Sequence, residues 1–334
     1  MATTETGATY IFFDIESANN INGEGYICSF GYVICDENFK VLEHNDIVMN
    51  PQIEFDEILL TEDSPCTLAY SREYFLSQPD FAYYYDKIKA LLLAPQRTAF
   101  GFAVENDLGF LTYACKHFRL EEVNFAAYDS QIVAAKLRMP HGGLTNWMKF
   151  FEIDTSSFTI HKSSDDAMMT MLLVQKLCEY QQIGIKDFAE NFPYAYHSVE
   201  QDRERRLFRE YKRYMDQQCN ALFHQHNLSP LSHRLKGKFK LLFDQNRDLE
   251  QVYEIIKLVY DNGGMIIKEV RSKCTVVGED GKERPQWMSS PRFASFRYIT
   301  FKELYAMLGK QEPPFMPQSK VVPSLQDIFK EYLV

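Results

Sequence analysis

Thr9-Tyr-Ile-Phe-Phe-Asp14-Ile-Glu16 is the most informative stretch of this chain. Aromatic and β-branched residues fill it up to Asp14, a composition typical of a strand that is buried on both faces. Asp14 and Glu16 stand two residues apart at its end, so both carboxylates project to the same side of the strand. Two negative charges at that range repel each other and raise a pKa, and a divalent cation would relieve the repulsion.

The segments after this strand predict a mixed sheet flanked by helices. Residues 26–35 and 40–48 read as two more strands around a polar turn at 36–38, which gives an antiparallel meander of three strands. Helices are expected over 81–93, after residue 107 and over 165–180, with short buried strands over 98–102 and 125–128. Two strand-to-helix crossovers in this order require parallel strands beside the antiparallel ones.

Length and composition favour a folded protein of two domains. The chain has 334 residues, of which 46% are hydrophobic and 25% charged, and this balance excludes global disorder, a collagen-like repeat and a coiled-coil rod. No apolar run is long enough to span a bilayer, and the first residues lack a basic and apolar leader, so we expect a cytoplasmic protein without a membrane partner. The seven scattered cysteines contain no Cys-x-x-Cys pair and are expected to be reduced.

Charge divides the chain unequally. The net charge is -10, but residues 1–180 hold 12 Lys and Arg against 26 Asp and Glu, whereas residues 181–334 hold 24 against 20. An acidic protein is a poor partner for nucleic acid unless its basic residues are concentrated in one region. We therefore predict a first domain over 1–182, a basic helical connector and linker over 183–235, a second domain over 236–310 and a Pro-containing tail with a terminal helix over 311–334.

Further acids stand at the ends of predicted elements. Asp107 opens the helix that follows a short buried strand, and Asp166 opens the last helix of the first half, five residues after His161. Taken singly, each has an ordinary structural explanation, because an acid in the first turn favours the helix macrodipole and a lone loop histidine is common on surfaces. Taken together with Asp14 and Glu16, they form an ordered set that those explanations account for poorly.

The set resembles the DEDDh 3′-to-5′ exonucleases of the ribonuclease-H-like fold, typified by the proofreading subunit of bacterial replicative polymerases. The resemblance covers roughly residues 8–182 and is carried by Phe12-Phe-Asp14-Ile-Glu16, Gly101-Phe-Ala-Val-Glu-Asn-Asp107-Leu-Gly-Phe-Leu111 and His161-Lys-Ser-Ser-Asp-Asp166-Ala167. Softer similarity lies at 128–130 and 143–144. The sequence departs from the family at Phe102 and Ala103, where a His-Asn pair is usual, and at Ser17, where threonine is usual.

This resemblance implies a site and a reaction. Asp14, Glu16, Asp107 and Asp166 would hold two divalent ions, Mg²⁺ or Mn²⁺, and His161 would be the general base, placed on a loop from which it swings in with substrate. Hard oxygen ligands suit these ions, and an imidazole titrates near neutrality, so the chemistry of the residues agrees with the implied roles. The departures at Phe102 and Ala103 affect how the terminal nucleotide is held rather than the metal ligands.

Two features of the second half bear on partners. On a helical wheel of residues 199–222, Leu207, Tyr211, Tyr214 and Met215 share one face and the other carries Arg205, Arg206, Arg209, Lys212 and Arg213. Arg205, Arg206, Arg209 and Arg213 are candidates for contacts to a nucleic-acid backbone, and a solvated basic face is the open alternative. Residues 236–309 alternate strand and helix, which predicts a small parallel sheet, and with Asn262-Gly-Gly264 they resemble a BRCT module.

The function predicted from these features is a metal-dependent exonuclease that releases 5′-monophosphates from the free 3′ end of nucleic acid. DNA is favoured because BRCT-like modules accompany DNA transactions. Two alternatives stay open, an exoribonuclease that trims RNA with the same site and a non-catalytic scaffold that uses its second domain. The second domain and the tail are the candidate surfaces for a protein partner or a second copy. For the tail, with its helically spaced apolar residues from Leu325 to Leu333, packing back on the fold is the default expectation, and docking to a partner is the open alternative.

Overall fold

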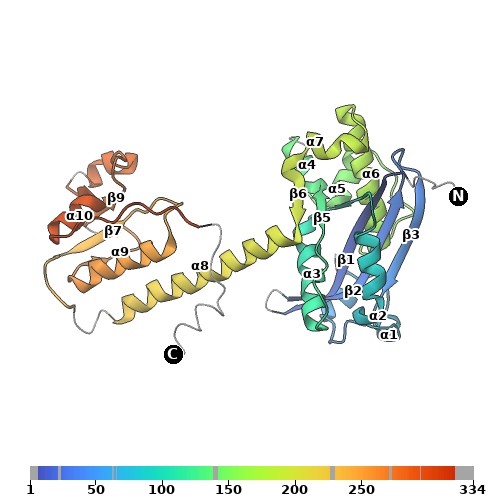
Figure 1. Cartoon of the computed structure of the whole chain (residues 1–334), viewed down its shortest axis with the longest axis horizontal. Coiled ribbons are helices and arrows are strands. Elements are labelled where there is room, and N and C mark those ends of the chain that lie inside the picture. The colour runs from blue at the N-terminus through green and yellow to red at the C-terminus, as the bar shows by residue number, and fades with distance from the viewer. Residues whose placement is uncertain are drawn as a thin grey trace. The chain divides into compact units, whose positions relative to one another are not determined.

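Figure 1 shows a computed structural model of the chain, which describes residues 7–21, 24–61, 64, 66–137, 142–225, 230–270, 273–293 and 295–319. The chain forms two compact units, the first from Met1 to Arg203 and the second from Glu204 to Val334. The boundary lies beyond the change of charge near residue 180. The first unit is longer than the expected 1–182 because a short helix and a strand after residue 182 also belong to it.

The first unit contains a six-stranded mixed sheet in the order β3-β2-β1-β4-β5-β6. Its strands are β1 (Thr9–Ile21), β2 (Glu24–Cys35), β3 (Val41–Val48), β4 (Arg97–Gly101), β5 (Ala126–Asp129) and β6 (Tyr196–Ser198). β1, β2 and β3 are antiparallel, β4 and β5 run parallel to β1, and β6 is antiparallel to β5. This is the mixed sheet of the ribonuclease-H-like class, so the predicted meander and crossovers are confirmed.

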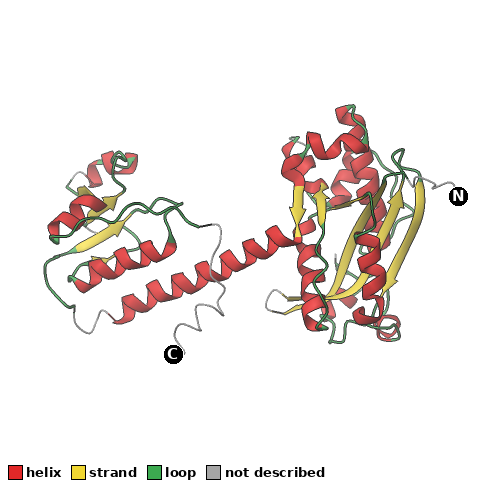
Figure 2. Cartoon of the chain, in the orientation of Figure 1, coloured by secondary structure: helices red, strands yellow, loops and turns green. Residues whose placement is uncertain are grey.

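Helices cover both faces of this sheet (Figure 2). They are α1 (Arg72–Leu76), α2 (Phe81–Leu92), α3 (Val104–His117), α4 (Ser130–Lys136), α5 (Leu144–Phe150), α6 (Ser163–Gln181) and α7 (Phe188–Asn191), with 3₁₀ turns at Glu57–Leu60, Ile185–Asp187 and Pro193–Ala195. α2 and α3 pack on one face, and α4, α5, α6 and α7 pack on the other. The helices expected at 81–93 and 165–180 are confirmed, whereas the short helices α4 and α5 were not predicted.

Alternation along β1 sends its side chains into two separate cores. Ile11, Phe13 and Ile15 pack with α2 and α3, and Tyr10 and Phe12 pack with α6 on the opposite face. Asp14 and Glu16 continue the series that begins with Tyr10 and Phe12, since side chains two residues apart share a face. Both carboxylates are therefore directed to the side of the sheet on which α6 lies.

A glycine lets the start of α6 approach the sheet closely. Gly31 of β2 pairs with Asp14 of β1, and a Cβ atom on Gly31 would lie 1.9 Å from the carbonyl carbon of Ser163. No other residue type fits there without moving the helix. Gly31 thus allows the first turn of α6, which carries Asp166, to lie beside the end of β1.

The second unit contains a four-stranded sheet in the order β10-β9-β7-β8. Its elements are β7 (Lys238–Leu241), α9 (Leu249–Asp261), β8 (Met265–Ile266), β9 (Thr275–Gly278), β10 (Arg297–Thr300) and α10 (Phe301–Met307), with 3₁₀ turns at Gln286–Ser289 and Pro291–Phe293. All three strand pairs are parallel, as the alternation of strand and helix predicted. β8 is the shortest of the four strands, with only two residues.

The predicted basic connector is a single helix, α8 (Val199–Gln225). Tyr211 and Met215 are buried, as the wheel predicted, whereas Leu207 and Tyr214 are only half buried. Of the tail, residues 311–319 pack on the second unit, where the amide of Asp248 donates to the carbonyl of Met316 over 2.9 Å. The predicted terminal helix lies outside the described residues.

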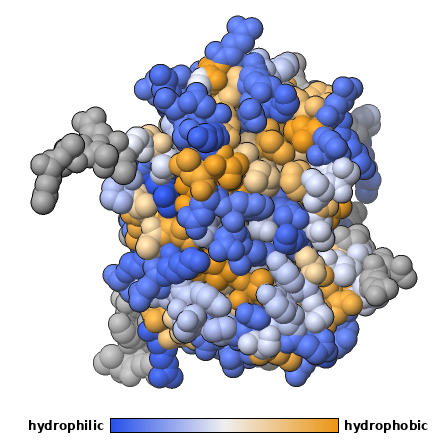
Figure 3. Space-filling view, turned by 90° about the vertical axis from the view of Figure 1, so that its right-hand side faces the viewer, coloured by the Kyte–Doolittle hydropathy of each residue, from blue (hydrophilic) through white to orange (hydrophobic). Residues whose placement is uncertain are grey.

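The face in Figure 3 mixes hydrophobic and hydrophilic groups, and the cysteines form no disulfide. Figure 3 shows one face, on which hydrophobic side chains form separate groups between hydrophilic ones, the ordinary state of a protein surface. All seven cysteines are free, and only Cys66 is exposed. Among the described residues, no helix has both the length and the apolar character that crossing a membrane requires.

Candidate active site

A cavity of about 380 Å³ lies at the point where β1, α3 and α6 meet. Its lining contains Asp14, Glu16, Asp107, His161 and Asp166, so the structure brings together all five residues that the sequence singled out as metal ligands and base. The remaining lining residues are Ile15, Phe102, Ala103, Asn106, Phe110, Gly143, Leu144, Thr145 and Ile160. Among the described residues that line the cavity, none is a lysine or arginine.

Asp14 and Glu16 reach the cavity from β1. Each pairs with a residue of β2, Asp14 with Gly31 and Glu16 with Ser29, and the ladder is interrupted directly after Glu16. A bulge of this kind re-aims the side chains beside it. The thiol of Cys28 lies 3.4 Å from the carbonyl of Glu16 at this irregularity.

Asp107 comes from the first turn of α3 and is 4% exposed. Its Oδ1 accepts a hydrogen bond from the amide of Ile15 over 3.1 Å, which ties α3 to β1 between the two acids of that strand. The start of α3 is fixed by Asp129, at the end of β5, whose carboxylate accepts from the amides of Ala103 and Val104. The interpretation of Asp107 as a simple helix-terminus residue therefore leaves out its direct bond to β1.

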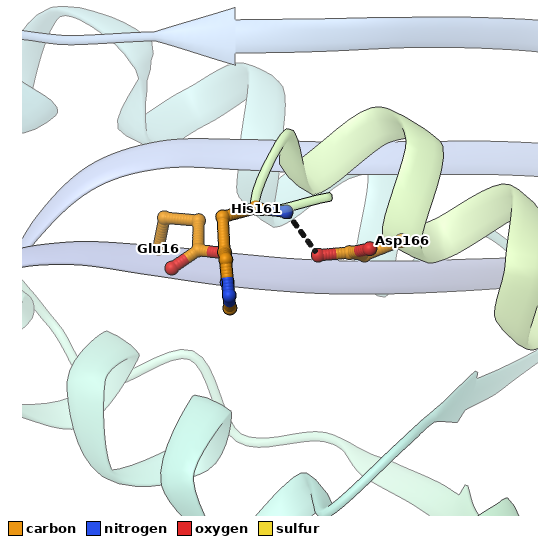
Figure 4. Close-up of side chains that lie close together, drawn as sticks. All are labelled: Glu16, His161 and Asp166. Carbon is orange, nitrogen blue, oxygen red and sulfur yellow. Dashed lines mark hydrogen bonds and ion pairs between the residues drawn. The ribbon is translucent and has the colours of Figure 1, made fainter. Parts of the chain in front are cut away.

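Asp166 and His161 come from α6 and the loop before it (Figure 4). Asp166 Oδ2 accepts a hydrogen bond from the amide of His161 over 3.1 Å, and His161 Nδ1 lies 3.2 Å from Glu16 Oε1. One donor atom from each of Glu16, His161 and Asp166 lies within 4.8 Å of the others. The imidazole already contacts Glu16, so the swing that we expected of His161 is not needed for this contact.

Burial and the repulsion of nearby negative charges disfavour ionisation of Asp14, Asp107 and Asp166. Burial raises the pKa of Asp14 well above its usual value, and the charges of Asp107 and Glu16 raise it further. Burial likewise raises the pKa of Asp107 well above the usual value, although the hydrogen bond from Ile15 opposes the rise. The pKa of Asp166 rises to about 7 because of burial and the charge of Glu16, and His161 opposes this shift.

The donor set fits hard divalent cations. Four carboxylates offer the oxygen ligands that Mg²⁺ and Mn²⁺ prefer. The raised pKa values of Asp14, Asp107 and Asp166 indicate that these three acids lack a positive charge that would favour their ionised forms. The cavity is large enough for ions together with part of a substrate. A cation there would supply the missing charge.

Sequence reasoning missed the apolar walls of the cavity. Phe102, Phe110, Leu144 and Ile160 line it beside the carboxylates, and Ile160 is 52% exposed. A signal was present for three of them. Phe102 stands where the DEDDh exonucleases usually have a polar residue, Phe110 lies inside the stretch from Gly101 to Leu111 that carries the resemblance, and Leu144 was noted as a softer similarity. Ile160 follows no pattern that distinguishes it from a core residue.

The predicted nucleic-acid contacts lie in the second unit rather than in the cavity. Arg205, Arg209 and Arg213 are exposed on α8, and Arg206 is half buried. They form no part of the described lining of the cavity. Their role as backbone contacts stays a prediction.

Comparisons with known proteins give structural neighbours only. No protein-family profile matches the sequence, and no curated protein matches it. The nuclease domain of 3′hExo, described as a DEDDh family member bound to rAMP, is 13% identical and aligns over 53% of this chain and 94% of its own, with a TM-score of 0.45.

Two other neighbours are also nucleases. E. coli exonuclease I in complex with a dT13 oligonucleotide is 15% identical over 52% of this chain and 42% of its own, with a TM-score of 0.43. Cell-death related nuclease 4 is 13% identical over 52% of this chain and 64% of its own, also with a TM-score of 0.43. The assignment of the fold rests on the strand order and not on these likenesses.

Proposed function

We propose that this protein is a metal-dependent 3′-to-5′ exonuclease that hydrolyses nucleic acid, preferentially DNA, to nucleoside 5′-monophosphates. The observation that carries the proposal is the convergence of four carboxylates and one imidazole, from segments far apart in the sequence, in one cavity that has no cationic side chain among its described lining residues. Buried carboxylates that raise one another's pKa are a costly arrangement, and such arrangements concentrate at functional sites.

Asp14, Glu16, Asp107 and Asp166 would hold two divalent ions, Mg²⁺ or Mn²⁺. When bound, such ions stabilise the charge that develops on the entering and leaving oxygens of a phosphodiester displacement. The protein contributes the fixed placement of the four carboxylates, which β1, α3 and α6 hold through the Ile15 and His161 amides. These backbone donors orient Asp107 and Asp166 as outer-shell hydrogen bonds orient metal ligands in general.

His161 would take the proton from the attacking water. If Nδ1–H donates to Glu16 Oε1, 3.2 Å away, Nε2 retains a lone pair that can accept a proton. The oxygen of that water then bonds to phosphorus, the bond from phosphorus to the 3′ oxygen breaks, and a nucleoside 5′-monophosphate leaves while the 3′ oxygen takes up a proton from solvent. The shortened strand keeps a 3′ hydroxyl, so the reaction can repeat.

The apolar walls suit the sugar and base of a terminal nucleotide. Phe102, Phe110, Leu144 and Ile160 offer flat or aliphatic surfaces, and Asn106 is the exposed amide among the described lining residues. Stacking on such surfaces tolerates every base, because each base has a π face. We therefore expect removal of all four nucleotides at similar rates.

Arg205, Arg206, Arg209 and Arg213 of α8 would contact the backbone of the substrate outside the cavity. The proposal is supported by their charge and by the exposure of Arg205, Arg209 and Arg213. Charge reversal at these arginines should flatten the dependence of binding on salt, because each phosphate contact adds about one unit to that slope. If the dependence of binding on salt is unchanged, these arginines form a solvated basic face and do not contact the nucleic-acid backbone.

The second unit would be a BRCT-like module that binds a protein partner or a second copy of the chain. Its support is the four-stranded parallel sheet and the turn at 262–264, where Gly263 has φ +86. Sedimentation of the full chain, alone and after substitution of the exposed Met265 by lysine, tests self-association.

The experiment that tests the function uses single-stranded DNA and RNA of one sequence, labelled at the 5′ end, with Mg²⁺, Mn²⁺ or a chelator. We expect stepwise shortening from the 3′ end that requires the ion, and His161→Ala should slow it about 10²- to 10⁴-fold, the usual contribution of a general base. Faster loss of RNA than of DNA would make the protein an exoribonuclease. No hydrolysis of either substrate would favour the non-catalytic scaffold.

A further inference from the structure

The backbone of His161 is held in a conformation that histidine seldom adopts. Its φ is +59, in the left-handed region, which is unfavourable for a residue with a side chain. Hydrogen bonds hold the backbone of this residue at both its amide and its carbonyl group. Its amide donates to Asp166 over 3.1 Å, and its carbonyl accepts from the amide of Ala69 over 3.3 Å.

Ala69 belongs to a segment that is far from the site in sequence and is itself anchored. Leu68 is 6% exposed, and its amide donates to the carbonyl of Leu59 over 2.8 Å. The hydroxyl of Tyr70 donates to Oδ2 of Asp46 over 3.0 Å. Ala69 is thus held in place between a buried leucine and a tyrosine that is bonded to β3.

Asp46 also contacts the helix that carries Asp166. Its Oδ1 accepts a hydrogen bond over 2.7 Å from Ser163, the first residue of α6, and the Ser163 hydroxyl lies 2.8 Å from that of Ser29 on β2. Each oxygen of Asp46 therefore serves a different part of the site. One faces the segment that holds His161, and the other faces the start of the helix that holds Asp166.

We propose that Asp46 is a positioning residue of the active site, which acts on His161 through Tyr70 and Ala69 and on Asp166 through Ser163. The proposal rests on the proposed nuclease function. Asp46 does not line the described cavity, so it has no direct contact with the reacting atoms. Its effect is to keep the imidazole and the carboxylate of α6 in one fixed relation, and small displacements of such groups cost about 10²-fold in rate.

The sharpest variant is Tyr70→Phe, which removes one hydroxyl and leaves the ring in its packing against Phe75 and Tyr74. The matched control is Tyr74→Phe, because Tyr74 stacks on Tyr70 at a centroid distance of 5.1 Å and is 46% exposed. We expect Tyr70→Phe to lower kcat about tenfold with KM unchanged. Tyr74→Phe should change neither constant.

A double-mutant cycle shows whether the effect passes through His161. In a His161→Ala background, Tyr70→Phe should cause no further loss of kcat, since the group that it positions is gone. An equal loss in both backgrounds would overturn the proposal. Asp46→Asn keeps one acceptor oxygen and should lose less activity than Asp46→Ala, and the unfolding temperature of each variant shows that it is folded.

A readout that needs no activity separates this inference from the proposed function. In Tyr70→Phe, the amide of Ala69 should exchange with solvent faster than in the wild type, and the NMR signal of the His161 ring should shift. Tyr74→Phe should leave both signals in place. If both signals respond but the wild type hydrolyses nothing, the positioning role of Asp46 stands and the proposed function fails. If Tyr70→Phe matches its control in amide exchange and in the ring signal, Asp46 does not position His161 through Tyr70.

Discussion

Asp14 shows at the scale of one residue why this cavity is more than a solvated strand end. Burial raises its pKa most, and the negative charges of Asp107 and Glu16 raise it further, so the three largest effects all oppose its ionised form. A residue kept for stability alone would not be placed where its charge is unfavourable. The arrangement becomes favourable when positive charge enters the cavity.

Asp14→Asn should therefore separate activity from stability. The change removes one of four repelling charges with little change of volume, so hydrolysis should fall to background while the unfolding temperature of the metal-free protein at pH 8 rises by a few degrees. Asp86→Asn, at an exposed position of α2, is the control and should change neither quantity. Near wild-type activity, or a lower unfolding temperature, would argue against a metal-binding role for Asp14.

The raised pKa values also predict how the metal-free protein responds to pH. The folded protein keeps protons on Asp14, Asp107 and Asp166 at pH values where the unfolded chain has released them. The contribution of these three carboxyl groups to stability is therefore fully present below about pH 4, and that of Asp166 is lost as the pH rises through about 7, its pKa in the folded protein. Thermal melts across this range should show the decline, and saturating Mn²⁺ should raise stability most at the alkaline end. A metal-free stability that rises with pH through this window would contradict the account.

The sequence predicted the five residues of the cavity better than it predicted their supports. The sequence shows where strands and helices end, and five polar residues stand at or near those ends: Asp14, Glu16, Asp107, His161 and Asp166. No sequence pattern links Asp46, Tyr70 and Ala69 to His161. Their contacts with each other and with His161 form only after β3 and the segment before α1 have packed. Contacts of this kind between distant segments are invisible to periodicity.

At the scale of elements, the close approach of β2 and α6 holds the site together. Gly31 permits it, since a Cβ there would lie 1.9 Å from backbone carbon of Ser163 and 2.0 Å from the amide nitrogen of Ser164. Backbone atoms at both points leave no flexible side chain that could move away. The position of Asp166 thus depends on a residue that contributes no ligand.

Gly31→Ala should weaken both fold and site. We expect a loss of about 1–3 kcal/mol in the free energy of unfolding, the usual cost of overpacking, together with weaker Mn²⁺ binding because α6 must move away from β1. Gly7→Ala, where a Cβ would meet nothing within 4 Å, is the control. Titration of each folded variant with Mn²⁺ measures the second effect, and unchanged affinity in Gly31→Ala would show that α6 does not depend on this contact.

Long elements were predictable, whereas several short ones were missed, although the short strands β4 and β5 were expected. α2, α3 and α6 carry enough periodic apolar residues to be recognised, and β1 was recognised by its apolar run. The meander turn was marked by Asp36, whose Oδ1 accepts from the amides of Asn38 and Lys40. β6 and α7 are three and four residues long, too short for a period to show. β8 ends at Ile266 because its pairing with β7 covers only two residues.

At the scale of the whole molecule, the chain consists of two units with separate cores. The first unit buries its apolar residues on both faces of the six-stranded sheet, and the second has a core of its own around α9 and β7. The boundary at Arg203 falls inside α8, where no break in composition marks it. The change of charge near residue 180 lies before this boundary. Charged side chains lie mostly on surfaces, so their distribution does not show which segments pack together.

Two separately packed units predict two unfolding transitions. In the second unit, Arg247 is 2% exposed, and its Nε donates to Glu279 over 2.9 Å. Arg247→Met leaves that carboxylate buried without its partner and should cost about 3–5 kcal/mol. In calorimetry, Arg247→Met should move the transition of the second unit to lower temperature and leave that of the first unit unchanged. Gly31→Ala should move only the transition of the first unit. A single transition that shifts in both variants would mean that the units unfold as one.

The central claim is that four distant carboxylates jointly bind divalent cations, and crystals of this 334-residue chain soaked in Mn²⁺ test it most directly. Anomalous scattering should reveal two peaks about 4 Å apart among Asp14, Glu16, Asp107 and Asp166. Asp14→Asn crystals treated in the same way should lose at least one of them. A cavity without manganese at saturating concentration, with the metal bound elsewhere or not at all, would contradict the claim.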